Sequence, residues 1–526
     1  MTASTSLATI IAHARAGALD RAWAMFEAAG AAEDDPAALA VKGRLLKDRA
    51  LRTTGAARAD LYREAAASYA RAAALGEATY PLINAATLSL LAGDRALSAD
   101  LARQVLARIA DHPDEPETPY YRAATRAEAL LLLGDGAAAQ GALGEAMALA
   151  PRAWEDHAST LRQFALILAA RGADAGWLDP LRPPRSLHFG GHMSFRADSQ
   201  PAALIDEIAA LLAGERIGFG YGALAAGADI LVAEALIARG AELHLLIPGG
   251  IAAFAALSVE PFGAAWRRRF DAVLARADTV RAVAPVGTPP DAAMIGLADD
   301  VAMGAALANA RRLASEAVQL LVLADAGDDA SSRSGATWLE GDPNRRQRIL
   351  IAPRECGKSS TLPAAEPGRR ALAILAIRRT AADGQAPPVE SEWLSSIKTI
   401  LDRGPAPAAG PGFTGEAVVV AYDAPGAAAE MAAVVARSLA AAVSIGGHYG
   451  VADLVHDPFS GGARVTGRPP AIAAAASCLA GSICISEDFA AVLEVANGRG
   501  FGSEFIGELA DPSSAPIGLH ALKRRS

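Results

Sequence analysis

The chain has 526 residues, of which 52% are hydrophobic and 20% are charged, and its net charge is −9. This length is too great for one hydrophobic core, and the composition is typical of a folded globular protein rather than a disordered one. The negative charge argues against a general nucleic-acid-binding surface. No uncharged apolar run reaches the roughly 18 residues of a membrane-spanning helix, so we expect no membrane partner.

The cysteines and the N-terminus bear on location. Cys356, Cys478 and Cys484 share no metal-ligand spacing, and we expect them to be reduced thiols. The opening MTASTSLATIIAHARAG lacks a convincing signal peptide. We therefore expect a cytoplasmic protein with no metal site.

Residues 1–180 show almost only helical patterns. Three similar stretches begin at Arg15, Leu90 and Leu131, and each places a glycine at a turn before a helix of small residues; these glycines are Gly17, Gly93 and Gly134. The pattern resembles tetratricopeptide repeats (TPR), although its intervals are irregular and longer than the usual period of about 34 residues. The resemblance implies a surface that contacts a protein partner. An ordinary Ala-rich helical bundle is the alternative.

The segment 185–355 changes character after the Pro-bearing hinge at 179–186. Apolar strand-like runs alternate with helical patterns, which predicts a Rossmann-like parallel sheet covered on both faces. The predicted strands lie within residues 186–195, 241–250, 280–285, 317–325 and 348–353, and residues 216–240 are predicted to form a strand, a glycine-rich turn and a helix.

A glycine-rich stretch from Ile217 to Asp229 is the strongest candidate binding site. Glycines between a strand and a helix allow a close backbone approach, and the helix N-terminus suits a phosphate. Loops at 190–192 and 248–250 would lie at the same edge of the sheet. The candidate ligand-binding residues are Gly190, Gly191, His192, Gly218, Gly220, Tyr221, Gly222, Gly227, Asp229, Pro248 and Gly249.

Other interpretations of these residues stay open. One alternative is that the glycines serve only strand–helix packing, and another is that His192 is a structural loop residue; His188 and His244 alternate within strands and are expected in the core. The stretch GYGALAAGADILVAEALIARGAELHLLIP resembles the SLOG-type Rossmannoid superfamily, which implies nucleotide sensing or processing. Relatives that cleave nucleoside monophosphates carry a PGGxGTxxE loop. Here Ile-Ala-Ala follows Gly250, so the resemblance implies a sensor rather than a hydrolase. Residues 334–337 are a further candidate phosphate-facing turn.

Residues 356–369 read as a linker, and 370–526 mix strands and helices in an α/β domain of ferredoxin-like type. The segments RALAILAIRRT, SIGGHYG and CLAGSICISEDFAAVL resemble, in this order, segments of class III nucleotidyl cyclases. The resemblance implies a fold whose relatives work as dimers. In the family, two aspartates hold two Mg²⁺ or Mn²⁺ ions that activate the ribose 3′-hydroxyl.

The residues that this chemistry requires are replaced here. Ala376 stands at the first aspartate and Glu416 at the second, Ala471 and Ala475 replace the asparagine and arginine that contact ribose and phosphate, and Asp511 replaces the lysine that reads the purine. Loss of such groups typically costs several powers of ten in rate. We therefore expect no catalytic residues in this domain.

The sequence as a whole predicts a multidomain protein with TPR-like repeats (1–180), a SLOG-like nucleotide-binding domain (185–355), a linker (356–369) and a degenerate cyclase-homology domain (370–526). The function that we expect is nucleotide-sensing signalling, with a nucleotide-type ligand, a protein partner on the repeats, and a homodimer formed through the cyclase-like domain. The alternative is an enzyme, either a divergent metal-dependent cyclase or a nucleotide hydrolase in the Rossmann-like domain.

Overall fold

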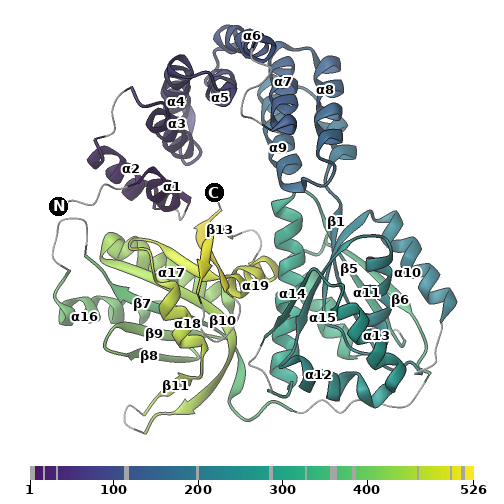
Figure 1. Cartoon of the computed structure of the whole chain (residues 1–526). Coiled ribbons are helices and arrows are strands. Elements are labelled where there is room, and N and C mark those ends of the chain that lie inside the picture. The colour runs from purple at the N-terminus through teal and green to yellow at the C-terminus, as the bar shows by residue number, and fades with distance from the viewer. Residues whose placement is uncertain are drawn as a thin grey trace. The chain divides into compact units, whose positions relative to one another are not determined.

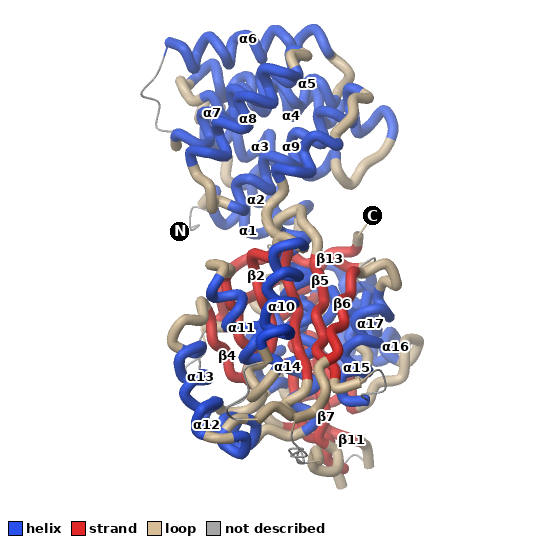
Figure 2. Tube along the Cα trace, turned by 90° about the vertical axis from the view of Figure 1, so that its right-hand side faces the viewer, coloured by secondary structure: helices blue, strands red, loops and turns tan. Residues whose placement is uncertain are grey.

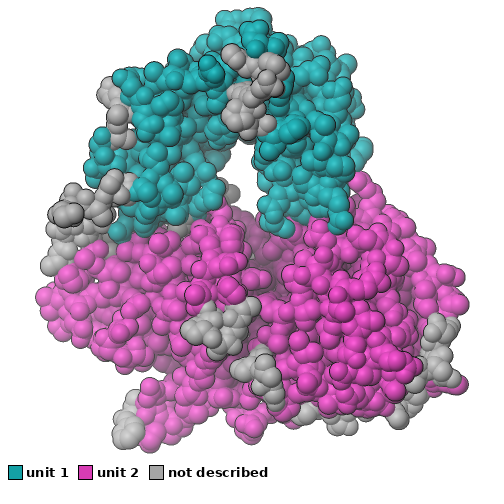
Figure 3. Space-filling view, viewed as in Figure 1, with its two compact units in different colours: residues 1–183, 312–314, 526 teal, residues 184–311, 315–525 magenta. Residues whose placement is uncertain are grey.

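The computed structural model describes all residues except 1–5, 16–17, 31–33, 112–117, 197–200, 284–287, 326–328, 356–363, 382–386, 459–460, 498–499, 511–515 and 526. The chain divides into two compact units (Figure 3). The first, the helical unit, comprises residues 1–183 with 312–314. The second, the α/β unit, comprises residues 184–311 and 315–525. Gly17, Cys356 and Asp511, which the sequence analysis singled out, lie outside the described residues.

The helical unit consists of successive helices, as the repeat pattern predicts. Alanines such as Ala65, Ala86 and Ala127 are fully buried between neighbouring helices, because small side chains let helix backbones approach closely. Its helices are α1 (Leu7–Arg15), α2 (Leu19–Ala28), α3 (Pro36–Ala50), α4 (Gly55–Leu75), α5 (Thr79–Leu91), α6 (Arg95–Asp111), α7 (Pro119–Leu133), α8 (Gly136–Leu149) and α9 (Trp154–Arg171), followed by the short helix η1 (Gly176–Leu181) (Figure 1).

The α/β unit begins with a six-stranded parallel sheet, which confirms the predicted parallel sheet. The strand order is β4-β3-β2-β1-β5-β6. The strands are β1 (Arg185–Gly191), β2 (Ile217–Gly222), β3 (Glu242–Ile247), β4 (Thr279–Ala282), β5 (Ala317–Leu323) and β6 (Arg346–Ile351). The connecting helices are α10 (Ala202–Gly214), α11 (Ala228–Ala238), α12 (Ile251–Ser258), η2 (Glu260–Phe262), α13 (Ala264–Leu274), α14 (Ala292–Arg312) and α15 (Asp329–Gly341).

The two faces of the parallel sheet differ in chemistry. Leu187, Phe189 and Leu245 belong to one apolar core with α10, α11 and α13; α10 is seen in front of the strands in Figure 2. The opposite face carries polar side chains that bond to α14 and α15. In register across three neighbouring strands, His188, Gln319 and Gln347 follow one another on this face. We call it the polar face.

A second, mixed sheet follows, with the order β13-β14-β12-β10-β7-β9-β8 and β11 paired to β10. Most of its neighbours are antiparallel, but β10 and β12 run parallel. The strands are β7 (Arg369–Arg379), β8 (Ala409–Phe413), β9 (Ala417–Tyr422), β10 (Val443–His456), β11 (Ala463–Thr466), β12 (Ile483–Ser486), β13 (Phe501–Leu509) and β14 (Ile517–Arg524). The helices are α16 (Glu390–Leu401), α17 (Pro425–Leu439), η3 (Ala440–Ala442), α18 (Pro469–Ala476) and α19 (Glu487–Asn497).

Helix α19 joins the two sheets within the α/β unit, and Figure 1 shows it beside α14. A Cβ added to Gly304 in α14 would lie 2.0 Å from the Ala491 carbonyl oxygen, and one added to Gly341 would lie 2.0 Å from the Val495 carbonyl oxygen. Only glycine leaves room for such contacts. The mixed-sheet region is therefore packed directly against the helices that cover the polar face.

Candidate functional site

The loops predicted to bind a ligand follow β1, β2 and β3 at one edge of the parallel sheet. These strands are parallel neighbours, so their carboxyl ends share that edge. The strand order reverses between β1 and β5, because β2 to β4 lie on one side of β1 and β5 and β6 on the other. Ligands of open α/β sheets bind at such a reversal. The end of β1, at Gly190 and Gly191, lies there.

The glycines of β2 lie where other parts of the chain pack closely against the strand. Gly218 and Gly220 lie inside the strand rather than in the turn where the sequence analysis placed them. A Cβ at Gly218 would lie 2.4 Å from Pro184 Cβ, and one at Gly220 would lie 2.3 Å from Leu236 Cδ1 of α11. Gly222 ends the strand. Glycine stands at these positions because other parts of the chain occupy the space that a side chain would need.

The loop glycines are also closely covered by the chain itself. Gly227, with φ +96°, precedes α11, and its Cβ would lie 2.9 Å from the His192 carbonyl oxygen. A Cβ at Gly191 would lie 2.6 Å from the Val322 carbonyl oxygen, and one at Gly249 2.7 Å from that of Thr288. Pro248 is buried beside Gly249. At Gly190, by contrast, a Cβ would meet no described atom within 4 Å.

His192 is held by hydrogen bonds on both ring nitrogens. Its Nε2 lies 2.7 Å from the Ala352 carbonyl oxygen, and its Nδ1 accepts from the Ser194 N–H at 3.1 Å. The ring stacks on Phe195 with centroids 4.6 Å apart. A histidine bonded in this way positions a loop and has no ring nitrogen left to act as a base.

Tyr221 and His244 stack on each other across β2 and β3, with ring centroids 4.7 Å apart. Burial raises the pKa of Tyr221 above its usual range, and it lowers that of His244. The imidazole also lies 3.0 Å from the Thr279 hydroxyl, Nδ1 to Oγ1. These rings therefore extend the polar face towards β4.

Asp229 has the least satisfied carboxylate at this edge. It lies in the first turn of α11 and is buried, and its Oδ2 accepts from the Ala225 N–H at 3.0 Å. Its Oδ1 accepts no hydrogen bond from the described residues. Burial raises the pKa of Asp229 to about 7, and the nearby Asp299 carboxylate raises it further, while the backbone amides of Ala225 and Gly191 oppose the rise. A buried acceptor without a donor suits a ligand hydroxyl or a water molecule.

A buried hydrogen-bond network, which includes the carboxylate of Asp299, runs across the polar face. His188 Nε2 lies 3.1 Å from Asp299 Oδ1, Gln319 donates to His188 Nδ1 at 3.2 Å, and Gln347 donates to Gln319 Oε1 at 2.7 Å. Because Gln319 donates to Nδ1, Nε2 is the ring nitrogen that donates to Asp299. Burial opposes ionisation of Asp299, but the bond to His188 keeps its pKa below the usual range.

A cavity of about 170 Å³ adjoins this network between the two sheet regions. Asp300 and Arg333 line it from one side and Tyr449 from the other, together with Thr337, Glu340, Gly341, Pro425, Val492, Val495 and Ala496. Burial raises the pKa of Asp300 to about 6, and the neighbouring Asp299 adds to the rise. Residues 334–337, predicted as a phosphate-facing turn, lie in helix α15 instead.

Charged residues hold the mixed-sheet region against the polar face. Arg281 of β4 lies 2.5 Å from Asp488 at the start of α19. Glu494, whose side chain is 4% exposed, is paired with Arg311 of α14 and, at 3.1 Å, with Arg525. Arg345 donates to the Glu494 carbonyl oxygen at 2.8 Å and so caps the end of α19.

Sequence reasoning did not identify these junction residues. The one local signal was a charged residue, Glu494, within the apolar run AAVLEVA of a predicted helix. A carboxylate in such a run is buried only if a cation meets it, and the cations lie far away in the sequence.

The positions that the cyclase resemblance assigns to metal binding hold no suitable donors. Ala376 is fully buried in β7. The Glu416 side chain is 78% exposed and pairs with Arg378 at 2.7 Å. Two divalent cations need several carboxylate groups, whereas these positions offer one, that of Glu416, which Arg378 already neutralises. Ala471 and Ala475 lie on α18 and bear no polar group. The residues present do not fit the metal ions, and no group of three potential metal ligands occurs among the described residues.

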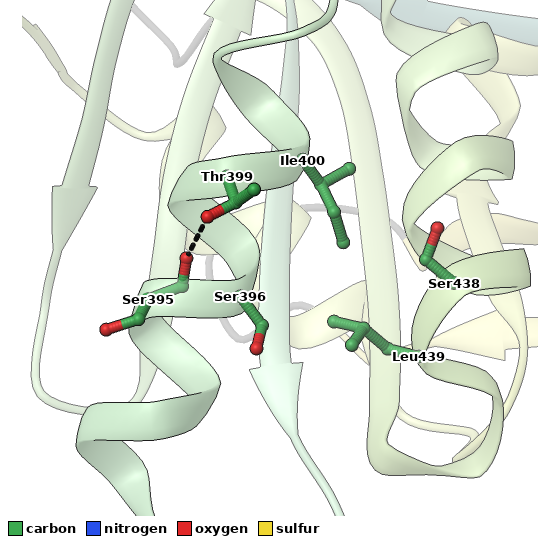
Figure 4. Close-up of a pocket in the computed structure, with 6 residues that line it drawn as sticks. All are labelled: Ser395, Ser396, Thr399, Ile400, Ser438 and Leu439. Carbon is green, nitrogen blue, oxygen red and sulfur yellow. Dashed lines mark hydrogen bonds between the residues drawn. The ribbon is translucent and has the colours of Figure 1, made fainter.

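A second hollow, of about 340 Å³, lies between α16 and the end of α17 (Figure 4). Hydroxyl groups line it, but Ser395, Ser396 and Thr399 each donate to the backbone carbonyl four residues earlier, for example Thr399 Oγ1 to Ser395 at 2.8 Å. Its floor is formed by Ile400 and Leu439. It has no charged or catalytic group.

Comparison with known proteins bears on both units. A Tetratricopeptide Repeats-Sensor family model matches residues 4–89. This match confirms the TPR-type resemblance over residues 4–89 of the helical region. No curated protein matches the chain in sequence. Among the described residues, no helix has the length and apolar character required to cross a membrane.

Solved structures of cyclases show a partial likeness of fold. The adenylyl cyclase CyaB from P. aeruginosa is 13% identical, with a TM-score of 0.25, and the match covers 30% of this chain and 96% of that one. An adenylate/guanylate cyclase/hydrolase from Silicibacter pomeroyi is 18% identical, with a TM-score of 0.23 over 29% of this chain and 95% of that one. A Trypanosoma brucei adenylate cyclase in its monomeric state is 13% identical, with a TM-score of 0.24, and the match covers 29% of this chain and 87% of that one.

Proposed function

We propose that this protein is a sensor and regulatory scaffold rather than a nucleotidyl cyclase. In this proposal each of three domains has its own role. The TPR-type repeats (1–180) bind a protein partner, and the SLOG-like parallel-sheet domain (185–355) binds a nucleotide-type ligand. The cyclase-like domain (370–526) forms the homodimer. The observation that supports the proposal is that buried Ala376 and arginine-paired Glu416 stand where the cyclase resemblance would put the metal-binding aspartates.

The ligand site that we propose centres on Gly190, where a Cβ would meet no described atom within 4 Å, and on Asp229. The ionised Asp299 would repel a bare phosphate at short range. Carboxylates at this place in a dinucleotide-binding fold accept hydrogen bonds from ribose hydroxyls. The unpaired Oδ1 of Asp229 suits such a donor. We therefore propose that the sugar of the ligand, rather than its phosphates, donates a hydrogen bond to Asp229 at this edge of the sheet.

Isothermal titration of the full chain with ATP, GTP and adenosine tests this assignment. At Gly190 a Cβ would meet no described atom within 4 Å, so we expect Gly190→Trp to fold, as circular dichroism would check, and to weaken binding at least tenfold. Gly214→Trp is a matched control, because Gly214 is equally open but precedes β2 at the opposite edge. Equal binding by the wild type and the Gly190→Trp variant, or no binding of any of the three probes, would contradict the assignment.

A further inference from the structure

The cavity of about 170 Å³ at the junction of the two sheet regions has no role in the functions proposed above. It lies within the α/β unit, and its walls come from α14 and α15 on one side and from β10, α17 and α19 on the other. A water molecule takes about 30 Å³ in the liquid, so the space can hold a molecule of several heavy atoms. None of its lining residues belongs to the edge at Gly190, so its occupant need not be the nucleotide-type ligand.

The charged side chains of the cavity leave an excess of negative charge. Asp300 and Glu340 are carboxylates, and among the described residues that line the cavity only Arg333 carries a positive charge. The Asp300 side chain is 17% exposed, yet the nearest Arg333 nitrogen, Nη2, lies 3.6 Å from its Oδ2. Arg333 itself is 66% exposed, so water weakens its attraction for the carboxylate. A carboxylate buried to this degree is normally in direct contact with a cation, and Asp300 is not.

The Tyr449 hydroxyl is a second polar group that the cavity leaves without a protein partner. Tyr449 lines the cavity from the wall opposite Asp300 and is 7% exposed. Its hydroxyl forms no hydrogen bond with another described residue. A buried hydroxyl in this state costs free energy unless a ligand or a water molecule meets it. Burial raises the pKa of Tyr449, so the hydroxyl keeps its proton and its oxygen can accept a hydrogen bond from an N–H group.

The wall formed by α17 and α19 is apolar. Val492 and Val495 are each 3% exposed, and Pro425 and Ala496 complete this wall. An anion does not suit the cavity, because the two carboxylates repel it and one exposed guanidinium would have to hold it. A neutral apolar molecule would leave Asp300 unpaired and would remove it further from water. The ligand that fits carries a positive charge on a short hydrocarbon chain.

We propose that the cavity binds a small aliphatic ammonium ion. The ammonium group donates hydrogen bonds to the Asp300 carboxylate and to the Tyr449 hydroxyl oxygen, and the hydrocarbon chain packs on Val492 and Val495. The positive charge of the ligand balances the excess negative charge of the lining. Because Asp300 and Tyr449 belong to different sheet regions, the bound ion contacts both regions and stabilises their junction.

Isothermal titration of the full chain with butylammonium, butanol and butyrate tests the proposal. At pH 8 the amine is protonated and Asp300, whose pKa burial raises to about 6, is ionised. We expect butylammonium to bind, and butanol and butyrate, which have the chain without the positive charge, to bind about tenfold more weakly or less. Methylammonium, which lacks the apolar chain, should also bind about tenfold more weakly. No binding of butylammonium, or equal binding of butanol, would overturn the proposal.

Two variants test where the ion binds. Asp300→Asn keeps the shape of the side chain and removes its charge, so it should weaken butylammonium binding by about tenfold or more. Tyr449→Phe removes only the hydroxyl and should weaken binding by about fivefold. Asp206→Asn, at an exposed position of α10, is the control and should bind as the wild type does, and circular dichroism checks that all three variants fold. Wild-type affinity in a folded Asp300→Asn or Tyr449→Phe variant would contradict the assigned contacts and overturn the proposal.

Discussion

Arg281 of the parallel sheet lies 2.5 Å from Asp488 at the first turn of α19, and this ion pair links the two sheets of the α/β unit. Burial alone would lower the pKa of Arg281, but Asp488 and Glu487 raise it. His448, behind Asp488, is buried and neutral, since burial lowers its pKa to about 4. The mixed-sheet region therefore contributes charged groups that complete the polar face.

Removal of the Glu494 carboxylate should loosen this junction. In Glu494→Ala, Arg311 and Arg525 lose their shared partner, and we expect a loss of about 1–3 kcal/mol in the free energy of unfolding, because both guanidinium groups can still reach water. Urea unfolding measures it. Glu504→Ala is the matched control: it breaks a more exposed pair with Lys523 and should cost less than about 1 kcal/mol. Equal losses would argue that the Glu494 pair is not a structural link.

A methyl group at Gly304 should separate α14 from α19. The added Cβ meets the Ala491 backbone, which cannot move aside as a flexible side chain can, so we expect Gly304→Ala to cost about 1–3 kcal/mol. Hydrogen exchange should quicken in α19. Gly214→Ala, where a Cβ meets nothing within 4 Å, should be neutral or stabilising by up to about 1 kcal/mol. Unchanged exchange in α19 would show that the close contact is not required.

These junction contacts could not be predicted from the sequence, whereas the parallel sheet could. Alternating strands and helices predicted the parallel sheet, because each strand–helix unit is local in the sequence. Gly218 and Gly220 were placed in a turn because clustered glycines usually mark one, whereas here their small size admits Pro184 and Leu236. At Gly304 the partner lies in α19, far along the chain, and no local pattern indicates it. Similarly, the hydrogen bonds that occupy His192 depend on Ala352, which only the folded chain brings near.

Asp229 should make stability depend on pH. Its pKa is about 7 in the folded protein and about 4 when unfolded, so the folded state holds its proton more tightly between these values. The contribution of Asp229 to stability is therefore fully present below about pH 4 and falls by about 4 kcal/mol as the pH rises through 7. In Asp229→Asn, which cannot ionise, this loss should vanish.

The difference between wild type and variant isolates this effect in urea unfolding at several pH values. The comparison with the variant is needed because burial also lowers the pKa values of His448 and His520 to about 4. These two histidines make the stability of the protein fall as the pH falls, whereas Asp229 makes it rise. Asp206→Asn, at an exposed position of α10, is the control and should track the wild type. A constant difference between Asp229→Asn and wild type across pH 4–8 would be inconsistent with a buried, protonated Asp229.

The central claim is that the cyclase-like domain does not catalyse cyclisation, and cyclic nucleotide formation by the full chain tests it most directly. The protein is incubated with ATP or GTP and Mg²⁺ or Mn²⁺, beside an active class III cyclase at equal concentration. Because Ala376 and the Arg378-paired Glu416 cannot hold two metal ions, we predict no product above the protein-free blank. Metal-dependent formation of cyclic AMP or cyclic GMP that disappears in Glu416→Ala would contradict the account.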